Sequence, residues 1–544
     1  MNKFIIPIIA AVIISAGIGV FFIFQKPPFP EPIGKCGDGV CDAFERVNPN
    51  LCPKDCQQIQ PPVTQPTPSE QPTTQPLAIS EEDSPFGSNN PFLSDQTKTS
   101  ERLKDLGVVW ITDHLPRKQI EKQRKAGDIT YNFSQIDDKI REYGQETLSH
   151  AWFVINVDSK LKHSDGKKEG KTYIPHGPQS MKAYGDYLLA LIDYVNTKVP
   201  GWRVEYWSID NEEHNMYIRA FCDSKKIDKK CGREAAKAYV DVVSLSYKII
   251  REKDPQAKVI LGGAGGSTKD EEFDYFYKPV FEILKQSDPE GFFDGWDYHN
   301  FNNFDKYKVA PNDKGISFYR GLLEKAGFTN KELLVKAGGT HTGMDKRGIP
   351  RLRVYQTERQ QAEHLIKRAV YHVANGVKLI FWGTIREKED IKEGESVFNY
   401  IGLIYNGVPK TGECNPKEQL PCPDPGDGIK KLSYYTYKKM VEVLKGSDWN
   451  NIQTIQESNG VYVYKFTKNG KPVWVAWNDN TNPQIIVLDI GNSNSAKITE
   501  TVPKYESGKE VTNYNTAFNA ETKTVSDGKL TITLTGKPIF VESK

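Results

Sequence analysis

The stretch YWSIDNEEH, from Tyr206 to His214, changes from an apolar, aromatic run to a polar, acidic one. Such a change is typical of a buried strand that opens into a loop, and it places Asn211 and Glu212 just beyond the strand end. A second stretch, LLVKAGGTHTG at 333–343, has the same form but holds Ala337 at its strand end and no acidic residue. The two stretches therefore predict strand ends with unequal chemistry.

Working outward from these stretches, apolar strand-like runs alternate with amphipathic helical runs from Glu101 to about Lys445. The expected strands are 107–113, 129–133, 151–157, 203–210, 258–264, 293–301, 332–338 and 377–385. This alternation predicts a parallel sheet closed into a (β/α)8 TIM barrel over 101–445. A doubly wound open sheet is the competing fold, but no Gly-rich phosphate loop opens a helix here.

The pattern changes after Lys445 to short alternating runs, the first of which is GVYVYKFTKNGKPVWVAWND at 460–479. Its NGK segment between two Val, Tyr and Trp runs is a strong hairpin signal. The sequence therefore predicts a C-terminal antiparallel β-sandwich over 446–544.

The charge balance excludes one class of partner. The 544 residues include 72 Lys and Arg and 70 Asp and Glu, a net charge of +2. No basic stripe or nucleic-acid-binding motif overrides this balance, so we expect no nucleic-acid partner.

The first 25 residues indicate the cellular compartment, because the segment from Phe4 to Phe24 carries no charge and is long enough to cross a bilayer. No small-residue cleavage pattern follows, which favours an uncleaved transmembrane anchor over a signal peptide. We therefore expect a single-pass protein of the cell membrane with the bulk of the chain extracellular, or a secreted protein if the segment is cleaved.

The eight cysteines agree with export, because they fall into short local groups in loop-like segments. We expect all of them to form disulfides. They are Cys36, Cys41, Cys52, Cys56, Cys222, Cys231, Cys414 and Cys422.

The first four cysteines lie in a module over 26–57 that is too small to own a core. Its oxygen-bearing side chains suit calcium better than zinc, which is the second choice. The candidate ligands are Asp38, Asp42, Glu45 and Asp55. A linker rich in Pro, Thr and Gln follows over 58–100 and is expected to stay extended.

Polar and aromatic residues gather at the strand ends of the expected barrel, where such folds build their sites. Besides Glu212, the candidates for a binding surface are Asn211, His214, Tyr298, His299, Asn300, His341 and Trp382. Each has a structural alternative: a lone histidine is more often hydrogen-bonded in the fold, and Trp382 can simply cap the barrel.

From about residue 101 to its end the chain resembles the large clan of (β/α)8 retaining glycoside hydrolases with an appended β-sandwich. It is similar to the β-xylosidase, arabinofuranosidase and cellulase families in the Asn-Glu pair after strand four, and in GLIYNGVPK (402–410) followed by LSYYTYKKM (432–440). The resemblance implies that Glu212 is the general acid/base, that Asn211 meets a sugar hydroxyl, and that the partner is a polysaccharide or glycan. It implies no cofactor for the barrel.

The resemblance also exposes a gap, because a retaining hydrolase needs a second carboxylate about 5 Å from the first. The clan carries this nucleophile after strand seven in a Thr-Glu-x-Gly pattern, where Lys336 and Ala337 stand here. Three explanations stay open. The barrel is a carbohydrate-binding pseudoenzyme; a further carboxylate acts as an inverting base; or the register of strand seven differs. The candidates for that further carboxylate are Asp345, Asp297 and Glu358.

We therefore expect an extracellular glycoside-hydrolase-like protein that acts on glycosidic bonds through Glu212, with an inactive glycan-binding protein as the alternative. A structural cell-surface protein is a further alternative.

Overall fold

The structure is a computed structural model that describes residues 83–89, 96–123, 128–144, 150–198, 203–223, 227–265, 268–343, 354–388, 397–408 and 425–544. All of these residues belong to one unit of the chain, Gln60–Lys544. The expected anchor (1–25), the Cys-rich module (26–57) with its calcium candidates, and Asp345 lie outside the described residues.

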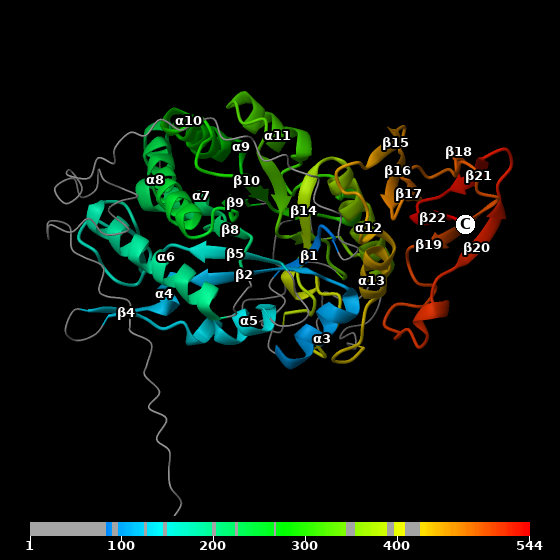
Figure 1. Cartoon of the computed structure of the whole chain (residues 1–544), viewed down its shortest axis with the longest axis horizontal. Helices are drawn as coiled ribbons and strands as arrows, with labels where there is room; N and C mark the ends of the chain where they lie inside the picture. Colours follow the sequence, from blue (N-terminus) through cyan, green and yellow to red (C-terminus); the bar gives the residue numbers. More distant parts are fainter. Residues whose placement is uncertain are drawn as a thin grey trace, which may run out of the picture. The chain divides into compact units, whose positions relative to one another are not determined.

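Eight parallel strands close into a barrel in the order β1-β14-β12-β10-β9-β8-β5-β2 (Figure 1). They are β1 (Phe86–Asn89), β2 (Trp110–Pro116), β5 (His150–Asn156), β8 (Tyr206–Ile209), β9 (Lys258–Ala264), β10 (Gly295–Tyr298), β12 (Glu332–Val335) and β14 (Val377–Trp382). The predicted (β/α)8 barrel is confirmed, and strands four and seven are those of the two stretches considered first.

The first barrel strand corrects two expectations. It is β1, inside the range assigned to the linker, whereas the run 129–133 contributes β4 (Ile129–Tyr131), which pairs with β3 (Glu121–Gln123) in a hairpin. The sequence FGSN has little strand propensity, and its place comes from pairing with both β14 and β2. Gly87 is required there, because an added Cβ would lie 2.3 Å from the ring of Phe381.

The helices that connect and cover the strands lie around the barrel (Figure 1). They are α3 (Gln96–Leu106), α4 (Arg117–Ile120), α5 (Ser134–Gly144), α6 (Pro178–Lys198), α7 (Glu213–Phe221), α8 (Lys229–Lys253), α9 (Asp270–Glu272), α10 (Lys278–Ser287), α11 (Ile316–Lys325), α12 (Glu358–Ala374) and α13 (Leu432–Leu444). A π-helical turn, η1 (Phe273–Tyr277), joins α9 to α10, and the hairpin of β6 (Lys167–Glu169) and β7 (Thr172–Ile174) precedes α6.

The barrel interior is filled by large side chains, and these fix which strand positions face the axis. The buried cluster comprises Val109, Trp110, Trp152, Tyr206, Ile260, Leu334, Leu379 and Phe381. Val109 precedes β2; for the cluster members that lie within strands, alternation of side chains between faces means that positions two residues farther along the same strand also face inward. This parity identifies the side chains that reach the C-terminal mouth of the barrel.

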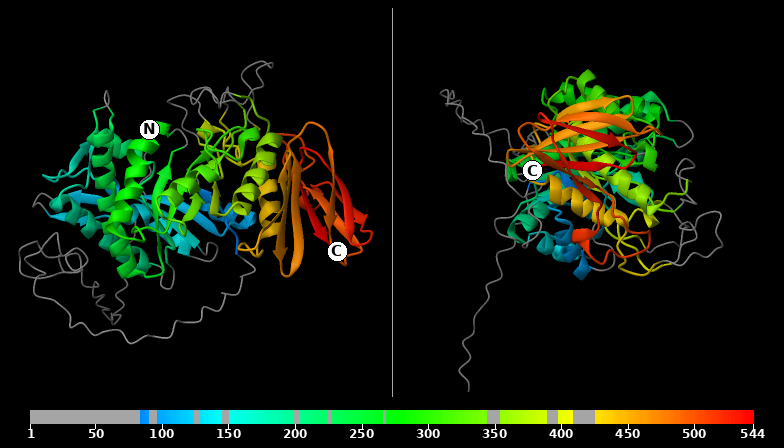
Figure 2. Two further views of the ribbon diagram at one scale, coloured as in Figure 1. Left: turned by 90° about the horizontal axis from the view of Figure 1, so that it is seen from above. Right: turned by 90° about the vertical axis from the view of Figure 1, so that its right-hand side faces the viewer.

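The C-terminal domain is an antiparallel sandwich, as predicted, of a six-stranded sheet in the order β15-β16-β17-β22-β19-β20 over the pair β18-β21 (Figure 2). Its strands are β15 (Gln453–Ser458), β16 (Val461–Lys468), β17 (Lys471–Asn478), β18 (Gln484–Asp489), β19 (Ser495–Glu500), β20 (Ala520–Thr524), β21 (Lys529–Leu534) and β22 (Ile539–Ser543). The predicted NGK hairpin joins β16 to β17, and Asn469 and Gly470 both take the positive φ that such a turn requires.

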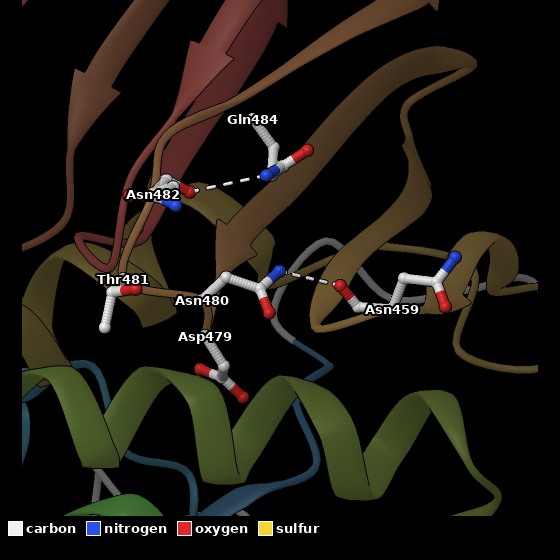
Figure 3. A pocket seen from close by; sticks show the side chains of 6 residues that line it. All are labelled: Asn459, Asp479, Asn480, Thr481, Asn482 and Gln484. Atoms are coloured by element: carbon white, nitrogen blue, oxygen red, sulfur yellow. Dashed lines mark hydrogen bonds between the residues drawn. The ribbon is translucent and has the colours of Figure 1, made fainter.

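Asp479 links the sandwich to the barrel. Its carboxylate accepts hydrogen bonds from the Tyr307 hydroxyl at 2.8 Å and from Nζ of Lys367, on α12, at 3.1 Å. A polar hollow of about 630 Å³ opens beside this contact, and there the Asp479 side chain points toward α12 (Figure 3). The hollow is lined by Asn459, Asp479, Asn480, Thr481, Asn482 and Gln484.

One predicted disulfide is confirmed, because Cys222 and Cys231 are bonded and join the end of α7 to the start of α8. The other six cysteines lie outside the described residues. Within the described part of the chain, no helix is both long enough and apolar enough to span a bilayer.

Candidate functional site

Glu212 stands between β8 and α7 on a strained turn. Asp210 and Glu212 adopt positive φ angles of 64° and 52°, which non-glycine residues rarely take. The turn leaves 39 % of the Glu212 side chain exposed, while the next residue, Glu213, is buried. The strand end thus presents one carboxylate to solvent at the barrel mouth.

His299 bridges Glu212 to a second carboxylate, that of Asp297 on β10. Its Nδ1 lies 2.9 Å from Oε1 of Glu212, and its Nε2 lies 3.4 Å from Oδ2 of Asp297. Burial opposes a charge on this ring, but its contacts with the two carboxylates and their negative charges outweigh it and raise the pKa of His299 to about 9. The imidazolium form is therefore the stable one at neutral pH.

The same contact sets the protonation of Glu212. Burial alone would raise its pKa, but the hydrogen bond and positive charge of His299 lower the pKa of Glu212 to about 2. A general acid must hold its proton until the leaving oxygen takes it. Glu212 is thus an ionised hydrogen-bond acceptor in this structure, a poor starting state for a general acid.

Lys336 follows β12 and precedes Ala337, the residue predicted to stand at the vacant nucleophile position. It is two residues beyond the inward-facing Leu334, it is fully buried, and its Nζ donates a hydrogen bond to Oδ1 of Asn211. Ala337 is also buried, and its carbonyl accepts a hydrogen bond from the backbone of Asn300. The Lys336 side chain therefore reaches the Asn-Glu pair.

Asp297 compensates the Lys336 charge. Its Oδ1 accepts a hydrogen bond of 2.7 Å from the Lys336 backbone N–H, and its Oδ2 lies 3.7 Å from Lys336 Nζ. Burial lowers the pKa of Lys336, and the negative charges of Asp297 and Glu212 oppose that shift. The side chains of Asp297 and Lys336 have almost no exposed surface, so Asp297 has no face on which to activate a water molecule.

The two remaining candidates for a second carboxylate do not supply one among the described residues. Glu358 lies at the start of α12 and accepts hydrogen bonds from the Tyr405 hydroxyl and from the backbones of Leu432 and Gly508. Through these contacts Glu358 connects α12 to α13 and to a loop of the sandwich, which is a structural role. Asp345 lies outside the described residues.

Two further acids, Asp210 and Glu213, are buried behind Glu212. Burial raises the pKa of Asp210 to about 8 and holds that of Glu213 well above its ordinary value. Asp210 accepts a hydrogen bond from the Val157 backbone, whereas neither carboxyl oxygen of Glu213 has a hydrogen-bond partner within the described structure. Both are therefore neutral groups of the barrel wall at neutral pH.

Five residues predicted to contact a ligand are instead buried wall residues. His214 contacts the Tyr277 hydroxyl and Thr268, and Tyr298 stacks on Tyr319 with ring centroids 4.1 Å apart. Less than a tenth of either residue is exposed. Both pack against the surrounding elements, which corrects the prediction that they meet a sugar.

The other three are likewise engaged. Asn300 contacts Nε2 of His372 at 2.8 Å, and His341 contacts the Val354 carbonyl at 3.2 Å. The Trp382 indole donates to the Ile401 carbonyl at 2.9 Å and is only 2 % exposed, so its ring offers no face for stacking. All three side chains are buried, so none presents a surface to a sugar in this structure.

Two mouth residues escaped the sequence analysis: His114 at the end of β2 and Asn156 at the end of β5. They lie four residues beyond the inward-facing Trp110 and Trp152, and His114 Nδ1 contacts Asn156 Oδ1 at 3.1 Å. Burial, together with the positive charges of Lys336 and His299, lowers the pKa of His114 to about 3. The alternation of side chains along the strand could have identified His114. The predicted strand 107–113 ended at Asp113, one residue before it.

Comparison with known proteins supports the fold. No protein-family profile and no curated protein sequence matches the chain. Solved structures do, among them a family 39 glycoside hydrolase from Bacteroides cellulosilyticus, with a TM-score of 0.57 and 15 % identity over 86 % of this chain and 82 % of that one. The chain has the fold of a glycoside hydrolase.

Two further structures agree. A family 39 enzyme from Xanthomonas axonopodis matches with a TM-score of 0.50 and 13 % identity over 86 % of this chain and 95 % of that one. A monomeric β-xylosidase from Caulobacter crescentus matches with a TM-score of 0.53 and 14 % identity over 84 % of this chain and 95 % of that one. The predicted resemblance to this group of barrels is thus confirmed for the fold, and the chemistry must be argued from the site itself.

Proposed function

We propose that this chain binds a glycan at the mouth of a glycoside-hydrolase barrel and does not cleave it by the retaining two-carboxylate route. The observation that carries the proposal is the Lys336 ammonium group at the end of β12, hydrogen-bonded to Asn211. A retaining hydrolase needs a carboxylate nucleophile about 5 Å from its acid/base. An ammonium group at that end of the barrel cannot attack an anomeric carbon as a carboxylate does.

The state of Glu212 supports the same proposal. Its ion pair with His299 favours the ionised form, so the group that would protonate a leaving oxygen has no proton to give at neutral pH. Ionised carboxylates are nevertheless strong hydrogen-bond acceptors for hydroxyl groups. The loss of acid function is thus compatible with binding.

The mouth offers further groups that suit a polyhydroxylated ligand. Asn211, Glu212, His114 and Asn156 all keep part of their surface exposed, and they combine amide, carboxylate and imidazole chemistry. A small number of such groups at the C-terminal end of a barrel is the usual way to orient a bound molecule. We assign Asn211 and Glu212 as the central ligand contacts.

Hydrolysis by a different route is the second candidate, and the 39 % exposure of the Glu212 side chain favours it. It would require Glu212 to regain a proton when a ligand displaces His299, and a base placed roughly 6.5–9.5 Å away for inversion. Product formation that depends on Glu212 would distinguish this candidate from binding alone.

We also propose that the barrel and sandwich, here called the head, function outside the cell. The segment 1–25 would anchor them, the Cys-rich module and the linker would separate them from the membrane, and the four acidic residues of the module could bind calcium. The Cys222–Cys231 disulfide supports this placement, because such bonds persist in oxidising compartments. Protease added to intact cells should release the head. Release only after lysis would place the head inside.

The proposed function is tested by binding of the full chain, kept in mild detergent, to an array of plant, fungal and bacterial oligosaccharides. We expect retention of a defined group of glycans and loss of that retention in Asn211→Ala. Asn480→Ala, in the sandwich hollow, is the matched control and should bind as the wild type does. Absence of binding to every glycan, or equal binding by Asn211→Ala, would overturn the proposal.

A further inference from the structure

Phe398 is an unusual side chain at the mouth of this barrel. Six large apolar side chains are exposed in the described part of the chain, and Phe398, 43 % exposed, is the only aromatic one among them. It lies in the short helical turn η4 (Val397–Asn399), which follows the C-terminal end of β14 in the chain. An exposed phenyl ring has an unfavourable contact with water, which a stacking ligand would remove.

Phe301 forms the second half of this feature. Its ring meets that of Phe398 edge to face, with centroids 5.3 Å apart and planes at 80°. Phe301 lies on β11 (Asn300–Phe301), two residues beyond His299 and so on the order of 7 Å along an extended chain. The two rings, here called the aromatic platform, therefore lie next to the strand end that contacts Glu212.

The backbone around the platform is firmly held. The Trp382 indole and the Gln361 amide both donate to the Ile401 carbonyl, at 2.9 and 3.2 Å. Nζ of the buried Lys431 donates to the Tyr400 carbonyl at 3.0 Å. These contacts hold the backbone two and three residues after Phe398, which limits the ordering that ligand binding would require.

Trp382 thereby gains a role different from the one predicted for it. Its ring packs under Gly339, where an added Cβ would lie 3.0 Å from the indole, and Gly339 is paired with Phe301. The indole supports the two segments that present the platform and offers no surface of its own. The stacking function expected of Trp382 is thus available at Phe398 instead.

We infer that the aromatic platform of Phe301 and Phe398 is a sugar-stacking subsite for a neutral oligosaccharide whose other end occupies the Asn211–Glu212 site, an inference that rests on the proposed function. The C–H face of a pyranose suits a phenyl ring, because the ring face is electron-rich and the contact excludes water. The ammonium group of Lys388 lies over the Phe398 ring, 5.4 Å from its centroid, so a sugar would contact the part of the side chain that stays exposed.

The test measures affinity against chain length with the full-length protein, using the array glycans in titration calorimetry as monosaccharide, disaccharide and tetrasaccharide of one series. Phe398→Ala should weaken tetrasaccharide binding about tenfold and leave the monosaccharide within about twofold, since only the longer ligand reaches the platform. Phe398→Trp should restore affinity. Ile485→Ala, which removes a 72 % exposed apolar side chain from the sandwich, is the matched control and should change nothing.

The outcomes separate the two proposals. Equal tetrasaccharide affinity of wild type and Phe398→Ala, alongside loss of binding in Asn211→Ala, would overturn the platform and leave the proposed function standing. An equal loss for monosaccharide and tetrasaccharide would also overturn it, because the ring would then act on the central site. No binding of any glycan by the wild type would overturn both.

Discussion

Nζ of Lys336 donates a hydrogen bond to Oδ1 of Asn211 across the mouth of the barrel, from the end of strand seven to the end of strand four. In a retaining hydrolase the corresponding space must hold a carboxylate and an anomeric carbon. Here the Lys336 side chain and the Asn211 amide contact each other at this end of the barrel. The proposed glycan-binding function rests on this contact.

Replacing Lys336 should show how much its side chain contributes to the stability of the protein. Lys336→Met leaves the fully buried Asp297 without its ammonium partner, and breaking such a pair costs about 3 kcal/mol of unfolding free energy. Lys336→Met/Asp297→Asn should recover more than half of that loss in urea titrations. Lys497→Met, at a half-exposed pair, should be neutral. A Lys336→Met loss below about 0.5 kcal/mol would show that Asp297 is not paired through Lys336.

The charge of His299 can be followed directly by NMR. Its ring should titrate with a midpoint near pH 9, and Glu212→Gln should move that midpoint downward, because a negative neighbour that favours the imidazolium is gone. The His299→Gln spectrum assigns the resonance. A midpoint near 6.5 in the wild type would contradict the bridge between Glu212 and Asp297.

The same pair predicts the pH dependence of stability. The pKa of His299 is raised on folding, so its contribution is complete below about pH 6.5 and is lost as pH rises through about 9. The pKa of Glu212 is depressed, so its contribution is present above about 4.5 and is lost as pH falls through about 2. Thermal melts should therefore lose stability from pH 7 to 10 more steeply in the wild type than in His299→Gln. Parallel curves would rule this account out.

The disulfide should stabilise the helix that follows Glu212. Cys222 and Cys231 close a short loop between α7 and α8, for which chain entropy gives about 2–3 kcal/mol. Cys222→Ser/Cys231→Ser should lose that much in urea titrations, and adding reductant to the wild type should reproduce the loss. No difference between oxidised and reduced protein would mean that helix packing alone holds α7.

Asp479 should hold the sandwich to the barrel. Asp479→Ala removes the acceptor for the Tyr307 hydroxyl and for Lys367, two bonds that involve a charged group and together contribute about 2 kcal/mol. The expected result is a lower melting temperature and earlier proteolysis between residues 444 and 453. Glu521→Ala, at an exposed pair on the sandwich, is the control. An unchanged melting temperature would show that apolar contacts alone join the two domains.

Much of the fold was predictable because hydrophobic periodicity is a local signal. The strand that precedes Asn211 and Glu212 and the NGK hairpin both follow from residues that are neighbours in sequence. The first barrel strand was not predictable, because FGSN has no strand propensity and is held only by β14 and β2, far away along the chain. The run 129–133 has the composition of a strand, but it pairs with the nearby β3 in a hairpin and not with the barrel strands.

The site was predictable in part for the same reason. Glu212 and Asn211 lie at the mouth as expected, since the sequence shows where their strand ends. The contact of Lys336 with Asn211 could not be predicted, because it joins the ends of strands seven and four, which are far apart in the chain. The burial of Trp382 depends on Ile401 and Gly339, which no local pattern connects to it.

The most direct test of the central claim is release of reducing sugar ends from the array-positive glycans by the full chain, measured by mass spectrometry over a day at pH 5 and pH 7. The account predicts that the glycans are bound but not cleaved, and that wild type and Glu212→Gln release equally little product. Accumulating products that disappear in Glu212→Gln would contradict it, and would show that Glu212 acts as a catalytic acid despite its ion pair with His299.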